Sequence, residues 1–551
     1  MALEHLLREI MNGVPVLLAL ALCGLVLLYR LLSIGSRPKD YPPGQYSSHR
    51  PPTLPIIGNL HQIPKTNVHL QYQKWAQQYG PIFSLKLGQS TTIVLADGEV
   101  IRDLVDQRGA NYADRPKLWV RELFDDSRII MRGYDNLWRT ERKLYHSQLN
   151  ISVARKYLPY QELETLQMLT QIAEDPANFV QYLGRMTGSM ATSIAYGFRL
   201  PKATDPLTHE MLENSHGFFQ CVVRSAVLDW FPSLKPLVSL IPRHINPWAT
   251  EALAAYANEK KTFQKAYKMG LQSRLPCEIE ISFATDIEAA KPNMKLLSDH
   301  AAVYIAGIAF EGGADTTRYT LQGLFKAMAL FPEAQKKAQA ELDDVVGATE
   351  LPSSKHLGDL KYINCTAKEC VRWMPTAING AIPHATVNED QYRGYRIPAG
   401  ATVVLAVWSA SHDPKYFDDA RTFRPERQNP DTTIYEATNI ASPKERGLYG
   451  FGAGRRICPG MHVAHNTLML AIARILWAFN ITPAEDEAGN PVIIDRDAMA
   501  GGLAAMPAPF KCKITPRSEE RAALILEKWS ALSAKCLDEE GNYKQSMFDT
   551  K

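Results

Sequence analysis

Residues 451–460 read Phe451-Gly452-Ala453-Gly454-Arg455-Arg456-Ile457-Cys458-Pro459-Gly460 and place one cysteine in a glycine-rich loop. Glycine permits backbone with positive φ and lets the chain approach a flat ligand closely. Pro459 favours the first position of a following helix, which would put the Cys458 sulfur beside free N–H groups, and Arg456 adds a positive charge. The loop therefore favours a thiolate that binds a metal, with a buried structural cysteine as an equally weighted alternative on these residues alone.

The composition is that of an ordinary globular protein. Of the 551 residues, 46% are hydrophobic and 22% are charged, which is enough apolar material for a large core. The formal net charge is only +3, so bulk electrostatics does not favour nucleic acid as a partner. The eight cysteines include no C-x-x-C pair, which argues against a disulfide framework or a zinc ribbon and fits a reducing, cytosol-facing location.

The N-terminus carries a long apolar segment, Ile10–Tyr29, in which Asn12 is the one strongly polar side chain. About twenty apolar residues form a helix long enough to cross a membrane. Positive charges follow at Arg30, Arg37 and Lys39, which predicts an anchor with the bulk of the chain in the cytosol. A cleaved signal peptide is the alternative, but no small-residue cleavage site precedes these charges.

Four regions are predicted along the chain. Prolines between Pro42 and Pro64 favour a stiff, extended spacer between membrane and body. The regions are a membrane anchor at 1–33, a proline-rich linker at 34–64, a catalytic body at 65–515 and a C-terminal helical tail at 516–551 that is frayed at its end.

Helical patterns dominate the body. Two β-rich runs, Ile82–Leu87 and Thr91–Ala96, flank a Gly88-Gln89-Ser90 turn and predict a hairpin. One long helical pattern covers Leu296–Leu330. The proline-broken apolar run from Trp230 to Pro242 favours a buried loop over a segment that dips into a membrane or faces substrate. The expected class is mainly α with small β-sheets.

The middle of the long helical pattern reads Gly312-Gly313-Ala314-Asp315-Thr316-Thr317. Two glycines inside a helix cost about 2 kcal/mol relative to alanine, so they need a reason. They predict a widened helix turn against a ligand, with Asp315 and Thr316 placed to relay protons to it. A helix–helix contact that requires small residues, with Asp315 on a wet face, is the alternative.

Two further motifs each place two side chains on one face of a predicted helix. Glu369 and Arg372 lie three residues apart on one helix face, and Arg427 offers a second guanidinium to the same carboxylate. One buried carboxylate between two arginines would lock the fold without taking part in chemistry. Trp138 and Arg142 lie four residues apart, which suits a clamp for a carboxylate or an ordinary solvated helix face.

Taken together, these motifs resemble the cytochrome P-450 family of haem-thiolate monooxygenases. The loop at 451–460 matches the family's F-x-x-G-x-R-x-C-x-G signature, and 312–317 matches its oxygen-activation motif G-G-x-D-T-T. The other matches are E-x-x-R at 369–372, F-x-P-E-R at 423–427 and W-x-x-x-R at 138–142. The five motifs occur in the family's order, and the proline hinge at 51–59 and the chain as a whole are similar to fungal microsomal members of secondary metabolism.

The resemblance implies the P-450 fold, preceded by one N-terminal transmembrane helix, and haem b (iron protoporphyrin IX) as cofactor. Cys458 would be the axial thiolate ligand of the iron. The other implied haem-binding residues are Arg456, Trp138, Arg142, His384, Phe451, Gly454 and Gly460. Thr316 is implied to orient dioxygen and, with Asp315, to supply protons. Glu369, Arg372 and Arg427 are implied to form the structural lock.

The implied reaction inserts one oxygen atom from dioxygen into a lipophilic small molecule. Electrons would come from NADPH through a separate NADPH–cytochrome P-450 reductase, with cytochrome b5 as a second candidate donor. Five basic residues are expected to form the docking face, namely Arg139, Lys143, Lys444, Arg446 and Arg455. The expected location is the endoplasmic reticulum membrane, with the catalytic domain facing the cytosol. The identity of the substrate and the carbon that reacts stay open.

Two other functions fit parts of the sequence. Cys458, His462 and His465 share one helical face and are residue types that bind zinc, although zinc leaves Arg142, Glu369 and Thr316 unexplained. A haem-thiolate isomerase or sensor is the second alternative. Because Asp315 and Thr316 are both present, the sequence favours dioxygen activation over either.

Overall fold

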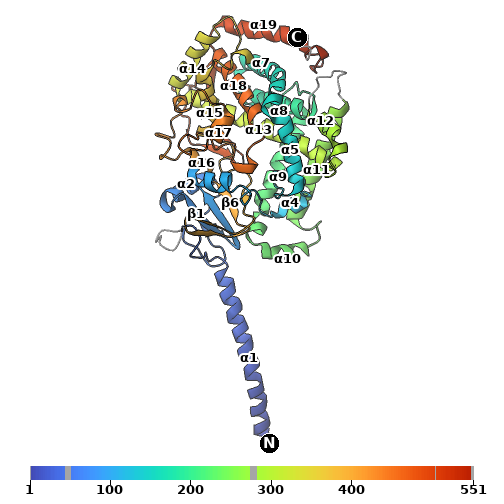
Figure 1. The fold of residues 1–551 in the computed structure, drawn as a ribbon, viewed down its shortest axis with the longest axis vertical. Helices are drawn as coiled ribbons and strands as arrows, with labels where there is room; N and C mark the ends of the chain where they lie inside the picture. The colour runs from blue at the N-terminus through green and yellow to red at the C-terminus, as the bar shows by residue number, and fades with distance from the viewer. Residues whose placement is uncertain (1, 44–50, 273–281, 503, 548–551) are drawn as a thin grey trace.

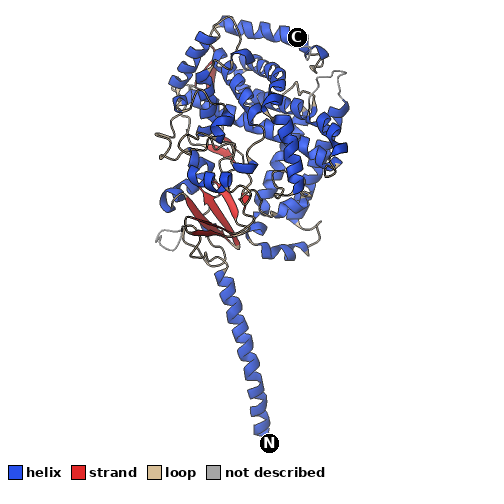
Figure 2. Ribbon diagram, viewed as in Figure 1, coloured by secondary structure: helices blue, strands red, loops and turns tan. Residues whose placement is uncertain are grey.

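The computed structural model describes residues 2–43, 51–272, 282–502 and 504–547. It is mainly helical, with the largest sheet at the end of the body from which the N-terminal helix leaves and other short strands elsewhere in the body (Figures 1 and 2). The α-helices are α1 (Ala2–Ser33), α2 (Val68–Tyr79), α3 (Gly98–Ile101), α4 (Trp119–Leu123), α5 (Asn136–Leu149), α6 (Ile151–Ala154), α7 (Leu158–Glu174), α8 (Phe179–Tyr196), α9 (Pro206–Trp230), α10 (Lys235–Ser239), α11 (Pro247–Gln272), α12 (Phe283–Ala290), α13 (Asp299–Leu330), α14 (Pro332–Val345), α15 (Lys361–Trp373), α16 (Val407–Ser411), α17 (Ile434–Asn439), α18 (Met461–Ala478) and α19 (Glu519–Cys536).

The strands form one four-stranded sheet and three two-stranded sheets. The larger sheet has the order β1 (Ile82–Leu87), β2 (Ser90–Leu95), β6 (Thr402–Leu405) and β3 (His384–Ala385). The smaller pairs are β4 (Asp390–Tyr392) with β5 (Tyr395–Ile397), β7 (Phe479–Pro483) with β10 (Cys512–Pro516), and β8 (Met499–Gly501) with β9 (Ala505–Pro507). The predicted hairpin is confirmed, since β1 and β2 pair antiparallel around Gly88, which has φ of +58°. The expectation of a mainly α protein with small sheets is also confirmed.

Helix α1 projects from the body as one helix of 32 residues (Figure 1). From Val16 onward its described apolar side chains are exposed, among them Leu18, Leu22 and Leu27, each more than 60% accessible. Over the part of the chain that the structure describes, none of the helices combines the length and hydropathy that crossing a membrane requires. The membrane span stays a prediction.

The described part of the proline-rich linker packs along the sheet. The Ser84 backbone N–H donates to the Pro42 carbonyl at 2.7 Å, and Asn59 and Lys86 exchange backbone and side-chain hydrogen bonds at 2.6 and 2.8 Å. Arg37 also donates to the Ser84 carbonyl at 3.1 Å. The described part of the linker, for which the sequence predicted a stiff, extended spacer, therefore docks on the edge of the body, because its backbone groups complete hydrogen bonds of the edge strand β1.

Helix α13 runs through the middle of the body and positions the site. It begins at Asp299, capped by the Ser298 hydroxyl, which accepts from the Ala301 N–H at 3.1 Å. The predicted start at Leu296 was three residues early. Helix α8 packs along it, with the rings of Phe179 and Phe325 4.6 Å apart. Most of α13 is buried, so the few exposed residues on it mark a face that the protein itself does not cover.

The segment after α9 differs from the sequence-based expectation. It is not a buried loop, because a short turn and helix α10 present apolar side chains to the outside. The exposed residues are Leu234, Leu237, Leu240, Ile241 and Ile245. The hairpin fixes this segment, since the Gln89 N–H donates to the Trp230 carbonyl at 2.8 Å. Helices α10 and α1 consequently lie at the same end of the body (Figure 1).

The C-terminal tail is ordered beyond its helix. Helix α19 covers α7, and the chain then returns so that Leu537 forms a β-bridge with Tyr543. Tyr543 is buried, with its hydroxyl 2.7 Å from Ser193 Oγ and its ring 5.2 Å from the ring of Tyr160. The described residues to 547 are therefore anchored, and the expectation of a frayed end does not hold for them.

Candidate functional site

The Cys458 loop is closed by its own backbone and held by a neighbouring turn. The Cys458 N–H donates to the Phe451 carbonyl at 2.9 Å. Gly454 has φ of +62°, and a Cβ there would lie 2.1 Å from the Val105 carbonyl oxygen. The Gly454 N–H donates to Asp106 Oδ1 at 2.7 Å. Glycine at 454 is thus required by contact with the 102–107 turn, which is a requirement other than the close approach to a flat ligand expected from the sequence.

Helix α18 follows the loop, with Gly460 as its N-cap and Met461 as its first residue. Pro459 therefore does not occupy the first helical position, contrary to expectation. Burial raises the pKa of the Cys458 thiol, and a hydrogen bond from the Gly460 N–H and the charge of Arg142 oppose this without cancelling it. The loop alone does not make a thiolate; a bound metal ion deprotonates such a thiol.

Arg142 of α5 contacts the loop, whereas Arg456 belongs to the loop and points to neighbouring segments. The Arg142 guanidinium donates to the carbonyl of Ile457, the residue before the cysteine. Arg456 donates to the Ala113 and Arg132 carbonyls at 2.6 and 2.7 Å, and its guanidinium lies 4.5 Å from the centroid of the buried Trp138 ring. The cation that acts on the sulfur is therefore Arg142, where the sequence pointed to Arg456.

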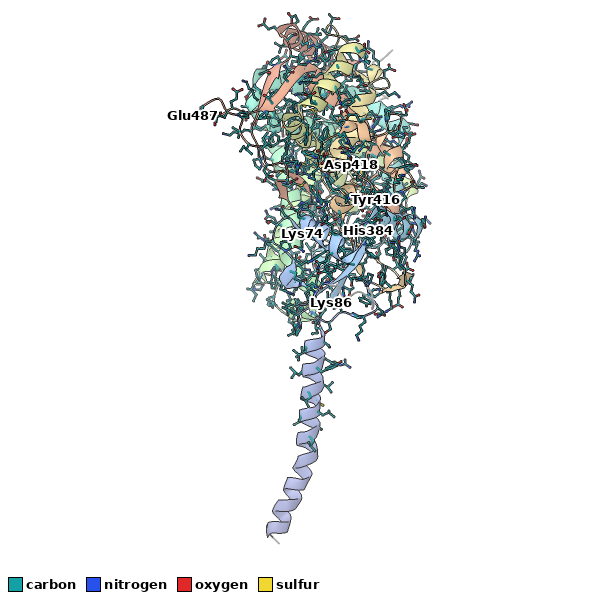
Figure 3. All side chains as sticks on the ribbon, turned by 90° about the vertical axis from the view of Figure 1, so that its left-hand side faces the viewer. Lys74, Lys86, His384, Tyr416, Asp418 and Glu487 are labelled. Atoms are coloured by element: carbon teal, nitrogen blue, oxygen red, sulfur yellow. The ribbon has the colours of Figure 1, made fainter. Side chains whose placement is uncertain are left out.

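Two more hydrogen-bond donors, the neutral His384 and the cation Arg115, lie beside these arginines and complete the cluster. His384 on β3, labelled in Figure 3, is buried and donates through Nδ1 to the Tyr112 carbonyl at 2.7 Å. Arg115 is buried and donates to the Ile130 carbonyl at 2.9 Å. Burial lowers the pKa of Arg115, and the charge of Arg456 lowers it further, while Asp114 acts in the opposite sense. Burial and the charge of Arg115 likewise lower the pKa of His384.

Arg115 is the site residue that sequence reasoning missed. It follows Asp114 and precedes Pro116, with no motif spacing to single it out. A buried arginine that donates to backbone carbonyls and faces other cations needs an anion near it. The cluster of Arg115, Trp138, Arg142, His384 and Arg456 therefore suits a ligand with carboxylate groups.

Helix α13 brings Thr316 and Gly312 to the uncovered face noted above. Both are exposed although the helix is mostly buried. The Thr316 hydroxyl donates to the Gly312 carbonyl at 2.7 Å, and a Cβ at Gly312 would meet nothing within 4 Å. Helix α13 is α-helical throughout Asp299–Leu330, so the predicted widened turn is absent from it. A methyl group at Gly313 would approach Ala191 of α8 to 3.3 Å, which is the predicted alternative of a small-residue helix contact.

Asp315 is buried and faces away from Thr316. Its Oδ1 accepts from Arg318 at 2.6 Å, one turn along the same helix. The structure thus brings Asp315 to Arg318 and does not join it directly to the Thr316 hydroxyl. Any transfer of protons between the two residues needs an intervening group.

Glu369 holds four hydrogen-bond partners behind the loop. Arg372 donates to both carboxylate oxygens at 2.7 and 2.8 Å, Arg427 to Oε1 at 3.1 Å and Gln428 to Oε2 at 3.0 Å. The backbone N–H of Arg424 adds a contact at 3.0 Å. Glu369 and Arg372 are fully buried. The arrangement joins α15 to the 424–428 turn.

The structure does not support the alternative of a zinc site at Cys458, His462 and His465. His462 stacks on Tyr435, with ring centroids 4.7 Å apart, and burial lowers the pKa of His465 to about 4. Across the described ranges, no group of three or more histidine, cysteine or acidic side chains is arranged to hold a metal ion. Cys458, His462 and His465 are therefore not brought together as a zinc site.

Comparison with known proteins decides the family. A family model described as cytochrome P450 matches residues 49–513. The chain belongs to the cytochrome P450 family. This P450 is 39% identical over 523 residues to cytochrome P450 monooxygenase virE of Hypocrea virens, covering 94% of this chain and 92% of that protein. It is 38% identical to cytochrome P450 monooxygenase fsoB of Humicola fuscoatra, covering 96% of this chain and 97% of that protein.

A solved zebrafish cytochrome P450 with abiraterone shares the fold. It is 22% identical, with a TM-score of 0.65, and the match covers 82% of this chain and all of that structure. Family membership implies haem bound through a cysteine thiolate. The residues present fit that group: a half-buried thiol on a closed loop, a cationic cluster short of carboxylates, and a glycine-lined helix face.

Proposed function

We propose that this P450 is a monooxygenase in which Cys458 ligates the haem iron and one oxygen atom from dioxygen enters a lipophilic small molecule. The observation that carries the proposal is the placement of the Cys458 thiol, beside the Gly460 N–H and the Arg142 guanidinium, on a loop whose ends are tied by the Phe451 carbonyl. Thiolate-ligated haem supplies the activation and cleavage of dioxygen.

The chain's own residues bind and orient the haem. Arg142 and Arg456 on the loop side, with Arg115, His384 and Trp138 on the facing elements, would hold the propionate groups. Each guanidinium already donates to at least one backbone carbonyl, so the arginine side chains are held in fixed directions and lose little side-chain entropy on binding. Phe451 and Gly460 would border the sulfur. Glu369, Arg372 and Arg427 keep the loop's supporting turn in place.

Two residues of helix α13 would deliver protons to the bound dioxygen. Thr316 presents its hydroxyl on the exposed face, fixed by the Gly312 carbonyl, where it can orient dioxygen. Asp315 would supply protons to it through a bridging group, with Arg318 setting the direction of the carboxylate.

An apolar cluster supports a lipophilic substrate. It joins α4 and the chain after it, helix α9, helix α11 and the segment before β3, four regions that are separated in sequence. Its buried members are Val120, Phe124, Met131, Phe218, Cys221, Ala252 and Ile382. Burial of apolar ligand surface against such side chains favours binding by about 25 cal/mol per Å². The fungal relatives named above suggest an intermediate of secondary metabolism.

Electrons would come from NADPH through a separate reductase, with cytochrome b5 as a further donor. Of the five basic residues predicted to form the docking face, Arg139, Lys143, Lys444 and Arg455 are exposed. Arg446 is buried against Asp106, with an ion pair of 2.5 Å, and is removed from that face. A positively charged surface attracts an acidic partner, and the rate of association then falls as the salt concentration rises.

The localisation that we propose is the endoplasmic reticulum membrane, with the catalytic domain in the cytosol. Its support is the exposed apolar surface of α1 and α10 at one end of the body (Figure 1). Exposed apolar side chains in such number on one end are typical of contact with lipid.

Reconstitution with a P450 reductase, NADPH and a panel of lipophilic metabolites under ¹⁸O₂ tests the reaction. The expected result is a product that carries one ¹⁸O atom. A product that rearranges without the label would instead support the isomerase alternative, and no NADPH-dependent turnover of any spectrally binding compound would support a sensor.

A further inference from the structure

Beside the distal helix, one guanidinium lies between two carboxylates. Arg128, in the chain between α4 and α5, donates to Glu311 of α13 at 2.8 and 2.9 Å. The same guanidinium donates to Glu259 of α11 at 3.2 Å and also stacks on Phe218 of α9, 3.7 Å from the ring centroid. The side chains of Arg128, Glu259 and Glu311 are 0%, 1% and 8% exposed.

The charges of this cluster do not balance. Two carboxylates share one cation, so the ionised cluster holds a net negative charge out of contact with water, which is costly unless a proton is bound. Burial raises the pKa of Glu311 to about 7, with the charge of Glu259 adding to the rise and Arg128 opposing it. Glu311 therefore holds a proton for part of the time at neutral pH.

Other titratable groups that face Glu311 are its own-helix neighbour Asp315, Tyr145 of α5 and Tyr196 of α8. Burial raises the pKa of both tyrosines, so they stay neutral donors. Within the described chain, the Tyr196 hydroxyl is buried without a hydrogen-bond partner. The Tyr196 hydroxyl is therefore a polar group near Glu311 whose donor capacity the described residues do not use.

Glu311 stands one helical turn before Asp315 and directly before Gly312, whose carbonyl binds Thr316. Residues four apart on a helix lie on the same face, about 6 Å apart at Cβ. Asp315 is occupied by its ion pair with Arg318, whereas Glu311 is the carboxyl that retains a proton. On the outer side, Ser127, the residue before Arg128, lies 2.6 Å from Nε2 of the half-buried His300.

We propose that Glu311, held by Arg128 and Glu259, stores the proton that Asp315 passes toward Thr316. This rests on the monooxygenase function proposed above. One proton leaves the Glu311 carboxyl group and is taken up by the Asp315 carboxylate. The Glu311 carboxylate then shares Arg128 with Glu259, and the net negative charge of the cluster draws a proton back to Glu311 from solvent past Ser127 and His300. Glu311 does not contact the reacting atoms. It acts through Asp315, by holding the proton that Asp315 receives, and is therefore a positioning residue.

The variant that tests this is Glu311→Gln, which keeps the shape of the side chain and one of the two hydrogen bonds from Arg128 but has no proton to transfer. Glu259→Gln is the matched control, because it changes the same cluster on α11, away from Asp315. Both variants are compared with the wild-type holoenzyme for haem content, thermal stability and the fraction of NADPH electrons recovered as hydrogen peroxide between pH 6 and 8.5.

The expected result is a several-fold rise in the peroxide fraction in Glu311→Gln, with loss of its pH dependence, an increased solvent isotope effect and unchanged haem content. Glu259→Gln should retain the wild-type fraction at low pH, and Glu311→Asp should recover part of it. Equal peroxide fractions and pH profiles in wild type and Glu311→Gln would overturn the proposal.

A second measurement needs no turnover. The infrared absorption of protonated carboxyl groups is followed in the holoenzyme as the pH is raised. The difference between the wild-type and Glu311→Gln spectra should contain a protonated carboxyl band that disappears as the pH rises through neutrality, because the contribution of Glu141 is common to both proteins and cancels. Absence of that band from the difference would overturn the proposal, and absence of any such band from the wild type would do so even if Glu311→Gln does not fold. Failure of the wild type to oxygenate any substrate would count against the proposed function, while this titration still decides whether Glu311 stores a proton.

Discussion

Glu369 and Arg372 face each other across one turn of α15, with Oε1 and Nη2 2.7 Å apart and neither side chain exposed. The Arg372 guanidinium also donates to the Ser411 and Ala420 carbonyls, both at 2.9 Å. The pair therefore joins α15 to two segments that lie more than thirty-five residues downstream, and its contribution is to the fold beneath the haem loop.

Removal of one member of this pair should destabilise the protein strongly. In Arg372→Ala the Glu369 carboxylate stays buried with one guanidinium fewer, and breaking such a pair costs about 3–5 kcal/mol. Thermal unfolding should show a large decrease in Tm, together with poor haem retention. Glu333→Gln, at the exposed ion pair between Glu333 and Lys336, is the control and should leave the Tm unchanged. Equal effects of the two substitutions would refute the lock.

Arg142→Ala and Arg115→Ala should each lower haem occupancy. Both remove a cation from the cluster that would hold the propionates, and a charged hydrogen bond contributes about 1.5–3 kcal/mol. Haem retention by apo-myoglobin challenge measures the effect, and we expect faster haem loss by about tenfold or more. Arg139→Ala removes an exposed arginine from the same helix and should leave haem loss at the wild-type rate. A similar rate for all three variants would contradict the assignment.

Thr316→Ala should keep haem content and divert electrons to hydrogen peroxide. The side chain is exposed and donates its hydrogen bond to the Gly312 carbonyl of the same helix, so its removal leaves the helix intact. Thr316→Ser keeps the hydroxyl and should retain coupling of NADPH use to product. The two variants are compared by peroxide and product yields per NADPH, and equal coupling in Thr316→Ala and wild type would exclude the role.

The pH dependence of stability should differ between wild type and Glu311→Gln. The pKa of Glu311 is raised to about 7 in the folded state from an ordinary value of 4.5, so the native state binds more protons than the unfolded state between these values. Its stabilising contribution is complete below pH 4.5 and is lost as the pH rises through 7, with a slope of at most about 1.4 kcal/mol per pH unit.

Glu311→Gln removes this contribution and should flatten the dependence of Tm on pH between 5 and 8. Glu141, whose pKa burial also raises to about 7, remains in both proteins, so the difference between their curves reports Glu311 alone. Parallel curves would show that Glu311 has an ordinary pKa.

Local patterns explain why much of this fold could be predicted. The β1–β2 hairpin depends on Gly88, and α13 on a long helical pattern without proline, and both signals lie within or beside the elements they specify. The site motifs were found for the same reason, because Trp138 and Arg142 or Glu369 and Arg372 are neighbours on a single helix.

The rest depends on contacts between distant residues. Arg128 meets Glu259 and Glu311 across 131 and 183 positions, and Tyr543 reaches Ser193 across 350. No spacing rule relates such residues, so neither the buried cluster nor the anchored tail could be predicted. The pKa of Cys458 was misjudged because burial, which only the fold determines, outweighs the adjacent charges.

The most direct test of the account is the absorption spectrum of the reduced carbon monoxide complex in wild type and Cys458→Ser. The account predicts the red-shifted Soret band of thiolate-ligated haem in the wild type and its loss in Cys458→Ser, with the protein still folded. Persistence of that band in Cys458→Ser would contradict the assignment of Cys458 as the ligand of the haem iron.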